Sequence, residues 1–348
     1  MKLLTSFSIT CIFLTNLFIS FAALSAETEQ AKLLLERFSQ SLRQVNFNTS
    51  FVVVKNNQAE PYHWMHGIIE KPIKESHANE DTENDIVFDS NVKERIELEI
   101  LALLNGPRRD ILRINNMVSY IEPEYAPYSI KSKQISGPIP TVFSQDVSVL
   151  ENNYHLVLVG KNRILGRAAQ LVRIVPKDSH RFGYWLWLDQ ESSLLLKLAV
   201  ITQQGNLLEQ IQFTHLDITD SISENLSQLE STELPKVIDI TVQQKEKDLV
   251  WQVNWLPNGF ESVKSDRHRI SKQTVESMLF NDGLVDISVY VSPSKEANRG
   301  VEFTNDGATI VLSKVSNNIE VSVVGKIPLE TATKIVSSVS FNRKLVSP

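Results

Sequence analysis

The seven histidines are the side chains of this sequence best suited to acid–base or metal chemistry near neutral pH. His63 and His66 lie three positions apart, a spacing that would let both bind one metal ion on a helix. Residues 62–69, however, alternate aromatic and polar side chains and are predicted to form a strand, where positions i and i+3 face opposite sides. The other histidines are scattered singly: His77, His155, His180, His215 and His268. We therefore expect solvent-facing or hydrogen-bonded histidines and no metal site.

The chain lacks the sequence motifs of known catalytic sites. It contains no G-x-S-x-G elbow, H-E-x-x-H, G-x-G-x-x-G or P-loop. The only cysteine, Cys11, lies in an N-terminal segment that we expect to be removed, which would leave no thiolate nucleophile, disulfide or cysteine-bound metal. Carboxylate pairs are plentiful, but a sequence does not show which of them lie within the roughly 5–10 Å of glycosidase geometry. The sequence predicts a protein without enzymatic activity or cofactor.

Two adjacent arginines follow a Gly-Pro turn signal in the stretch NGPRRDILR. Residues 110–115 predict a strand that begins directly after them. Adjacent side chains at a sheet corner point to opposite faces, so Arg108 and Arg109 are not expected to clamp one carboxylate together. We expect one of them to be available to a partner or to a neighbouring carboxylate. Arg267, further along the chain, is a third candidate for partner binding.

The most prominent apolar pattern lies in the stretch GYWLWLD and its neighbours. Trp185 and Trp187 share one face of the predicted strand, and Tyr184 and Leu186 share the other. If the hairpin registers are simple, one face of adjacent strands is lined by Trp185, Trp187, Leu198, Val200, Ile211 and Phe213. Such a face makes either a filled core or a hydrophobic cleft, and apolar stripes are usually core.

Strands are the main elements that must position these residues. Strand-compatible runs cover residues 50–54, 62–69, 95–104, 110–115, 117–121, 155–160, 169–176, 184–189, 195–202 and 207–215. Runs at such spacing indicate an antiparallel sheet rather than alternating helices and strands. Residues 28–44 place Leu34, Leu35, Phe38 and Leu42 at helical spacing, so an amphipathic helix is expected to pack on a larger element.

A second unit follows a change of pattern. Residues 217–236 lose the strand signal and are predicted to be a short helix plus linker. Beyond Trp251, strands are expected at residues 276–280, 285–291, 309–315 and 319–324, with a last helix that Pro328 begins. The predicted fold class is therefore α+β. We divide the chain into residues 1–26, an N-terminal domain over 27–218, a linker over 219–236 and a C-terminal domain over 237–342.

Residues 1–26 have the layout of a secretory signal peptide. A positive start is followed by an apolar stretch, small residues and then polar residues. The interrupted apolar run is short for a membrane span, which is the alternative reading. We expect cleavage after Ser25 or Ala26 and a soluble exported protein. The net charge of −6 argues against a general nucleic-acid binder, which normally has a basic excess.

Residues 75–89 contain six acidic residues and neither lysine nor arginine. Such a stretch cannot bury enough apolar area to offset its ordering entropy, so we expect a solvated surface loop. A cation site is the alternative, but the glycine turn of a Ca²⁺ loop is missing.

Several stretches together resemble the RseB/MucB family of periplasmic sigma-E regulators. They include LLNGPRRDILR, YHLVLVGKNRILGR, LVRIVPKDSHRFGYWLWLDQESSLLLK, WLPNGF, MLFNDGLVDISVYV and VVGKIPLETATKI, in this order along the chain. The resemblance covers most of the chain from residue 101 to residue 341. The acidic stretch near residues 70–92 departs from the expected pattern and puts the local sheet edge in doubt.

The resemblance implies a LolA-like N-terminal domain, in which a curved antiparallel sheet folds over helices around an apolar cavity. It also implies binding to the periplasmic part of the anti-sigma factor RseA, protection of RseA from the protease DegS, and release by lipopolysaccharide or lipoprotein acyl chains. It shifts the expectation for the Trp185 face from core to ligand cleft. A periplasmic lipid or lipoprotein carrier is the main alternative and an exported hydrolase a weaker one. A homo-oligomer is possible, and no nucleic-acid partner is expected.

Overall fold

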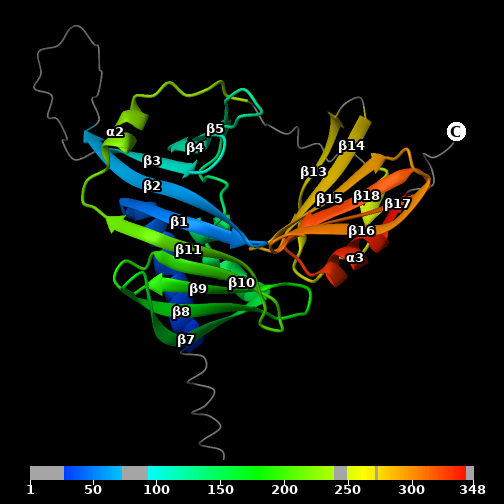
Figure 1. Cartoon of the computed structure of the whole chain (residues 1–348), viewed down its shortest axis with the longest axis horizontal. Coiled ribbons are helices and arrows are strands. Elements are labelled where there is room, and N and C mark those ends of the chain that lie inside the picture. Colours follow the sequence, from blue (N-terminus) through cyan, green and yellow to red (C-terminus); the bar gives the residue numbers. More distant parts are fainter. Residues whose placement is uncertain (1–26, 73–92, 239–248, 271–272, 342–348) are drawn as a thin grey trace, which may run out of the picture.

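The computed structural model describes residues 27–72, 93–238, 249–270 and 273–341. The predicted signal peptide and the predicted acidic loop at residues 75–89 lie outside the described residues. None of the described helices is long and apolar enough to cross a membrane. The chain forms a large curved sheet domain with a smaller sheet domain beside it (Figure 1).

Eleven strands form one antiparallel sheet in the first domain, in the spatial order β6-β5-β4-β3-β2-β1-β11-β10-β9-β8-β7. In β1, buried and less buried residues alternate, as expected for a strand with the core on one face. The strands are β1 (Phe47–Lys55), β2 (Gln58–Pro72), β3 (Lys93–Leu103), β4 (Arg109–Ile114), β5 (Met117–Ile121), β6 (Tyr128–Lys131), β7 (Tyr154–Ile164), β8 (Arg167–Pro176), β9 (Gly183–Asp189), β10 (Leu195–Ile201) and β11 (Leu207–Ile218).

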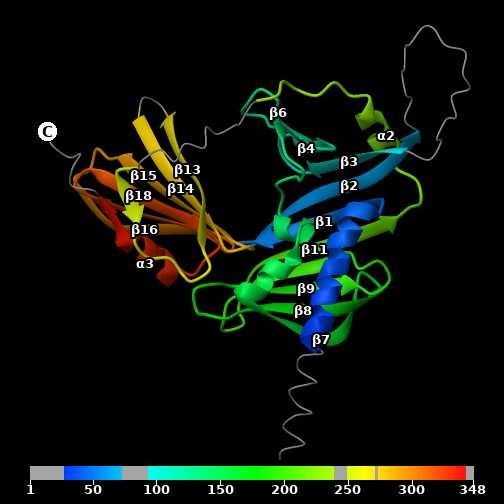
Figure 2. The same ribbon diagram turned by 180° about the vertical axis from the view of Figure 1, so that it is seen from behind.

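The concave face of this sheet is covered by one long and two short helices (Figure 2). Residues 27–44 form the predicted amphipathic helix, and η1 (Thr141–Ser144) and η2 (Val147–Asn152) are 3-10 helices. Leu35 and Phe38 are fully buried, and the Phe38 ring lies 5.7 Å from that of Phe143 in η1. The helical spacing of the apolar residues is therefore explained by packing against the sheet.

The convex face carries a different cover over β2 and β3. Helix α2 (Glu224–Glu230) lies within the predicted linker and packs Leu226 and Leu229 against Met65 and Leu98. A side chain at Gly67 would collide with Ile222 and Leu226, because a Cβ there would lie 2.6 Å from the first of them. Glycine at this position lets the helix approach the strand closely.

The second domain contains a six-stranded antiparallel sheet in the order β13-β14-β15-β18-β17-β16. Helix α3 (Leu329–Ser338) follows Pro328, as predicted, and buries Ala332, Ile335 and Val336. Its other elements are β12 (Trp251–Val253), β13 (Glu261–Ile270), β14 (Gln273–Asn281), β15 (Asp286–Pro293), β16 (Asn298–Asp306), β17 (Thr309–Ser316), β18 (Ile319–Gly325) and β19 (Val339–Phe341).

The predicted fold class is confirmed, with a curved antiparallel sheet packed on helices and a smaller α+β domain. The edge strands β13 and β16 were not predicted. Almost every residue of β16 is exposed, so its sequence lacks the apolar alternation that identifies a half-buried strand. Edge strands are held by backbone pairing on one side and need no apolar face to form.

Candidate binding cavity and domain junction

A cavity of 490 Å³ opens on the concave face, between strands β2–β4 and the segment that leads into η1. This volume falls within the range of about 300–1,000 Å³ that is usual for small-molecule sites. Its apolar lining includes Leu42, Phe51, Trp64, Leu101, Ile135, Pro138 and Ile139. Its polar lining includes Arg43, Glu97, Glu99, Arg113, Lys133 and Gln134. The mixture suits an amphiphilic ligand.

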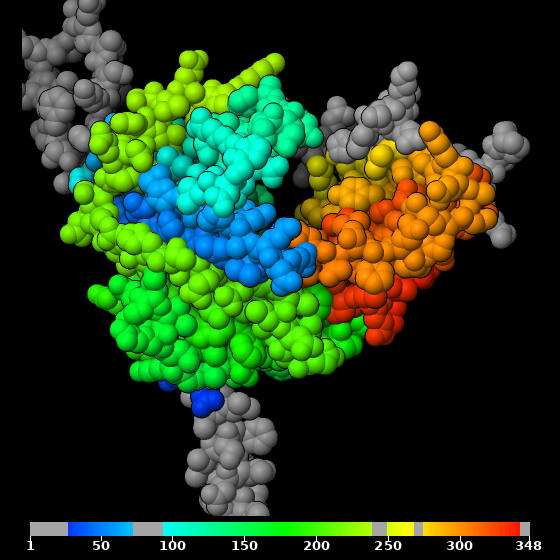
Figure 3. All heavy atoms as spheres, in the orientation of Figure 1, coloured from blue at the N-terminus to red at the C-terminus, as the bar shows by residue number. Residues whose placement is uncertain are grey.

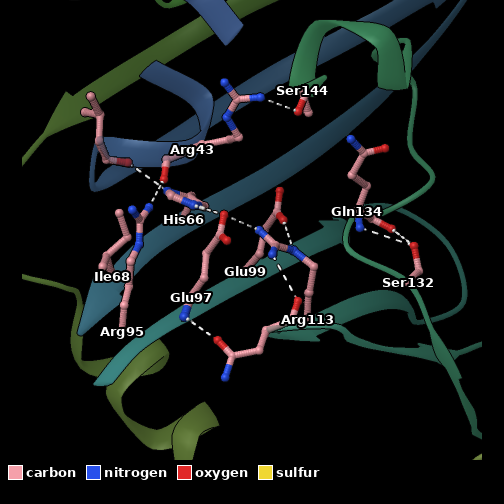
Figure 4. A network of polar contacts seen from close by, with 12 residues as sticks. Arg43, His66, Ile68, Arg95, Glu97, Glu99, Arg113, Ser132, Gln134 and Ser144 are labelled. Carbon is pink, nitrogen blue, oxygen red and sulfur yellow. Dashed lines mark hydrogen bonds and ion pairs between the residues drawn. The ribbon is translucent and has the colours of Figure 1, made fainter. Parts of the chain in front are cut away.

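Charged side chains that are bonded to one another form the floor of the cavity (Figure 4). Arg113 donates from Nε to Glu99 Oε2 at 2.7 Å and from Nη2 to Glu97 Oε1 at 2.8 Å. The second oxygen of Glu99 accepts a hydrogen bond of 2.7 Å from Trp64 Nε1. Arg113 and Glu99 are each about 95% buried, so these bonds offset the cost of removing their charges from water.

His66 extends this network behind the floor. Its Nδ1 lies 2.8 Å from the carbonyl oxygen of Val45 and its Nε2 lies 3.1 Å from Glu97 Oε1. Both neighbours are hydrogen-bond acceptors for the ring nitrogens of His66. Burial opposes ionisation of Glu97, but hydrogen bonds from His66 and Arg113 outweigh it and lower the pKa of this carboxyl to about 2. The network therefore holds Glu97 as a carboxylate at neutral pH.

The six residues predicted to line a common cleft do not share one face. The β9–β10 register places Leu186 opposite Leu198 and Trp185 opposite Ala199, so the tryptophans point away from Leu198. Leu198, Val200, Ile211 and Phe213 are buried in the main core on the concave side, whereas Trp185 and Trp187 belong to a separate cluster on the convex side. The predicted common face is therefore wrong, because the assumed register was off by one residue and such a shift exchanges faces.

The three arginines predicted to bind a partner each lie next to a carboxylate. Arg108 Nε lies 2.5 Å from Asp110 Oδ2, and Arg109 Nη2 lies 3.3 Å from Glu124 Oε1. Arg267 contacts Glu276 at 2.5 Å. Arg108 precedes β4 and Arg109 begins it, so the two side chains use different carboxylates, in keeping with the opposite-face expectation. All three side chains remain largely exposed, and their role in partner binding stays a prediction.

The structure does not bring His63 and His66 together into a metal site. His63 contacts Asn48 and is only partly buried, while His66 is buried on the cavity side. Among the residues that the structure describes, no group of three or more histidine, cysteine, aspartate or glutamate side chains is placed to hold a metal ion.

The junction of the two domains is centred on Asp282, whose side chain is fully buried. It accepts hydrogen bonds from Tyr154 Oη at 2.8 Å and from Arg181 Nε at 2.6 Å. Its backbone oxygen accepts one from Asn153 Nδ2 at 2.9 Å. Arg181 also bonds Asp178. Leaving any of these buried groups without its partner would cost several kcal/mol, so the junction favours one arrangement of the domains.

Further ion pairs surround the junction. Lys326 of the second domain pairs with Glu209 of β11, and the backbone N–H of Ala308 donates to the same carboxylate at 3.2 Å. Lys55, at the tip of the β1–β2 hairpin, lies 2.5 Å from Asp306. Figure 3 shows this hairpin, in blue, meeting the orange part of the second domain. A cleft between the domains is lined by Asp282 and mainly by polar residues in and around η1, η2, β13 and β14.

Sequence reasoning missed both the charged floor and the junction. Glu97 and Glu99 alternate with Leu98 and Ile100, a pattern that could have placed both glutamates on one face of β3. A charged face normally points to solvent, but here α2 covers the apolar face and the charged face lines the cavity. No sequence pattern singles out Asp282.

A curved sheet around a cavity, joined to a second sheet domain, defines a two-domain binding protein. The model of the MucB/RseB N-terminal domain matches residues 84–238, and that of the MucB/RseB C-terminal domain matches residues 245–340. The chain belongs to the MucB/RseB family. It is 27% identical to the sigma-E factor regulatory protein RseB of Haemophilus influenzae over 317 residues, which cover 91% of this chain and 93% of that protein.

Solved structures of MucB have the same architecture. The complex of MucA and MucB from Pseudomonas aeruginosa matches with a TM-score of 0.67 and 26% identity, over 90% of this chain and 99% of the matched chain. MucB in complex with MucA(peri) matches with a TM-score of 0.64 and 27% identity, over 89% and 98% of the two chains. Because the matches span nearly the full length of each chain, they include both domains.

Proposed function

We propose that this chain is a periplasmic regulator that binds the periplasmic segment of an anti-sigma factor of the RseA and MucA type. Bound in this way, the segment is protected from DegS, and the sigma-E response is restrained. The match to MucB from its complex with MucA, over both domains, is the single observation that carries the proposal. The secretory signal peptide expected at residues 1–26 supports export.

Protection follows from mass action. A segment present well above the Kd of the complex spends little time free, and a protease that needs the free segment is slowed in proportion. The two domains and the cleft between them offer a long, mostly polar surface. Buried ion pairs hold this surface in one shape, which lowers the ordering cost of binding.

We further propose that the release signal enters the concave cavity instead of the tryptophan face. An acyl chain gains about 0.8 kcal/mol for each buried CH₂ group. The apolar wall of Phe51, Leu101 and Ile139 would accept it, and the cations Arg43 and Lys133 would bind a phosphate or carboxylate of a lipid headgroup. Lipopolysaccharide and acylated lipoproteins both join acyl chains to polar groups and so have this amphiphilic character.

The segment from η1 to η2 connects the cavity with the junction. Thr141 and Gln145 line both the cavity and the cleft between the domains. Asn153 and Tyr154, which follow η2 directly, bond Asp282 in the second domain. A ligand that displaces η1 therefore acts on a segment that also positions the second domain, which couples lipid binding to release of the partner.

Two measurements on the purified protein test this function. Calorimetric titration with the periplasmic segment of the anti-sigma factor should give saturable binding, and a scrambled segment of the same composition should give none. In a reconstituted reaction with DegS, the protein should slow cleavage of the intact anti-sigma factor in a concentration-dependent manner. Unchanged cleavage at saturating protein would overturn the proposal.

A further inference from the structure

The convex face of β8–β10 carries two cations stacked on two tryptophans. The carbon of the Arg173 guanidinium lies 4.1 Å from the centroid of the Trp185 ring, and Lys197 Nζ lies 4.8 Å from that of Trp187. The two rings meet edge to face at 6.2 Å. We call these four residues the cation–tryptophan ladder. Cation–π contact of this kind holds each cation in place over its ring.

Neither cation of the ladder is neutralised by a carboxylate among the described residues. The structure shows no ion pair for either side chain, and the buried Nε–H of Arg173 has no hydrogen-bond partner. Burial lowers the pKa of Lys197.

The acidic residues nearest along these strands have partners of their own. Asp189, at the end of β9, accepts bonds of 3.0 and 2.9 Å from Arg167 and one of 2.7 Å from Ser192. Glu191 accepts a bond of 2.8 Å from Arg167. These carboxylates are therefore engaged, and the positive charge of the ladder is left to an outside group.

Apolar side chains surround the ladder, bury Trp187 and leave Arg173, Trp185 and Lys197 partly exposed. Val157 pairs directly with Arg173 across β7 and β8 and is 36% exposed, and Val175 is 37% exposed. Trp187 is only 9% exposed, because it packs among the apolar side chains of its own cluster. A membrane surface is better engaged by exposed aromatic side chains, whereas two cations held over largely buried rings fit an extended chain.

We propose that the cation–tryptophan ladder binds an extended acidic peptide segment of a partner protein, with one carboxylate on Arg173 and a second on Lys197. Stacking on Trp185 leaves the guanidinium edge free for a carboxylate. The ladder lies on the sheet face opposite the cavity. The proposal that it binds a peptide therefore does not depend on the proposed function.

The register sets the spacing of the carboxylates in such a segment. Trp185 pairs with Arg173, and Trp187 pairs with Lys197 on the other side of β9. The two cations are thus two strands apart and two residues apart along the strands, which corresponds to about 12 Å between their Cα positions. In an extended peptide at roughly 3.3 Å per residue, this separation matches acidic residues four positions apart, whose side chains point to the same side.

Fluorescence anisotropy of a labelled ten-residue peptide tests the proposal. The peptide contains serine and glycine with two glutamates four positions apart, and its control has glutamine in their place. The purified protein should bind the acidic peptide at low salt and not its control. Arg173→Gln and Lys197→Gln should each weaken binding about tenfold. Lys314→Gln, at an exposed lysine of the second domain, serves as the matched control and should leave binding unchanged.

Three outcomes would overturn the proposal. The first is equal binding of the acidic peptide and its glutamine control. The second is undiminished binding by the double variant that combines Arg173→Gln with Lys197→Gln. The third is absence of any peptide binding. Sedimentation with phosphatidylglycerol vesicles provides a further arm. Vesicle binding that depends on Arg173 and Lys197, without peptide binding, would assign the ladder to a membrane surface instead. The peptide control keeps the test decisive even where a protein variant fails to fold.

Discussion

The two halves of the eleven-stranded sheet are built from the same kind of hairpins but use their concave faces differently. In the β7–β11 half, Leu156, Ile174 and Leu198 are at most 1% exposed and form a filled core under the helix of residues 27–44. In the β2–β4 half, the corresponding face carries Glu99 and Arg113 and encloses the cavity. The covering element decides the difference, since a helix fills one half and a loop leaves the other hollow.

The convex faces show the reverse arrangement. Helix α2 covers the apolar residues of β2 and β3, while no helix of the described residues lies over the cation–tryptophan ladder of β8–β10. The cavity and the ladder thus lie in different halves of the sheet and on opposite faces. A sheet with this division can bind two ligands that do not compete for space.

The largest effect is expected from Arg113→Met, which leaves Glu97 and Glu99 without their shared cation in the floor of the cavity. Loss of one partner from a buried ion network costs about 3–5 kcal/mol of unfolding free energy. Urea unfolding followed by tryptophan fluorescence measures the loss. The triple variant with Glu97→Gln and Glu99→Gln should recover much of it, and a triple variant no more stable than Arg113→Met would contradict the charge argument.

Glu97→Gln should lower the unfolding free energy by about 2–3 kcal/mol at pH 7, because a neutral amide replaces the ionised acceptor of His66 and Arg113. The pKa of Glu97 falls from 4.5 to about 2 on folding, so its contribution is complete above pH 4.5 and is lost as the pH falls toward 2. The unfolding free energies of the unaltered protein and of Glu97→Gln, measured against pH, should converge over this window. A constant difference down to pH 2 would show that Glu97 acts by packing.

Substitution by tryptophan should affect stability differently in the hollow half and the filled half of the sheet. Leu198→Trp overpacks the core under the helix and should cost about 1–3 kcal/mol. Ile135→Trp points the same added volume at the cavity and should cost less than about 1 kcal/mol. Thermal unfolding by circular dichroism compares the two variants. Equal losses would mean that the cavity is too rigid to accept added apolar volume.

The smallest effects are expected at the exposed corner before β4. Arg108→Ala and Arg109→Ala, made separately, remove ion pairs at largely exposed side chains and should each change stability by about 0–1 kcal/mol. Titration with the anti-sigma segment then shows which arginine contributes to binding. Large and equal losses of affinity in both variants would contradict the separate use of the two side chains.

Periodicity predicted most of the strands and helices, because these elements have one face against a core. Residues 117–121 were predicted as a strand and form β5, and residues 28–44 were predicted as a helix and lie within one. Faces were harder to predict than elements. The tryptophan stripe was assigned to the same face as Leu198, and only the β9–β10 register shows that it lies on the other side. The cavity depends on contacts between residues far apart in the sequence, such as Trp64 with Glu99, which periodicity does not encode.

The affinity for the periplasmic segment of the anti-sigma factor, measured with and without an amphiphilic lipid, tests the central claim most directly. The unaltered protein should bind the segment and lose affinity when the lipid is added. Ile135→Trp, which fills the cavity, should bind the segment equally well but keep its affinity in the presence of lipid. Absence of binding in both proteins would contradict the proposed function, and an equal response of both to lipid would contradict the role of the cavity.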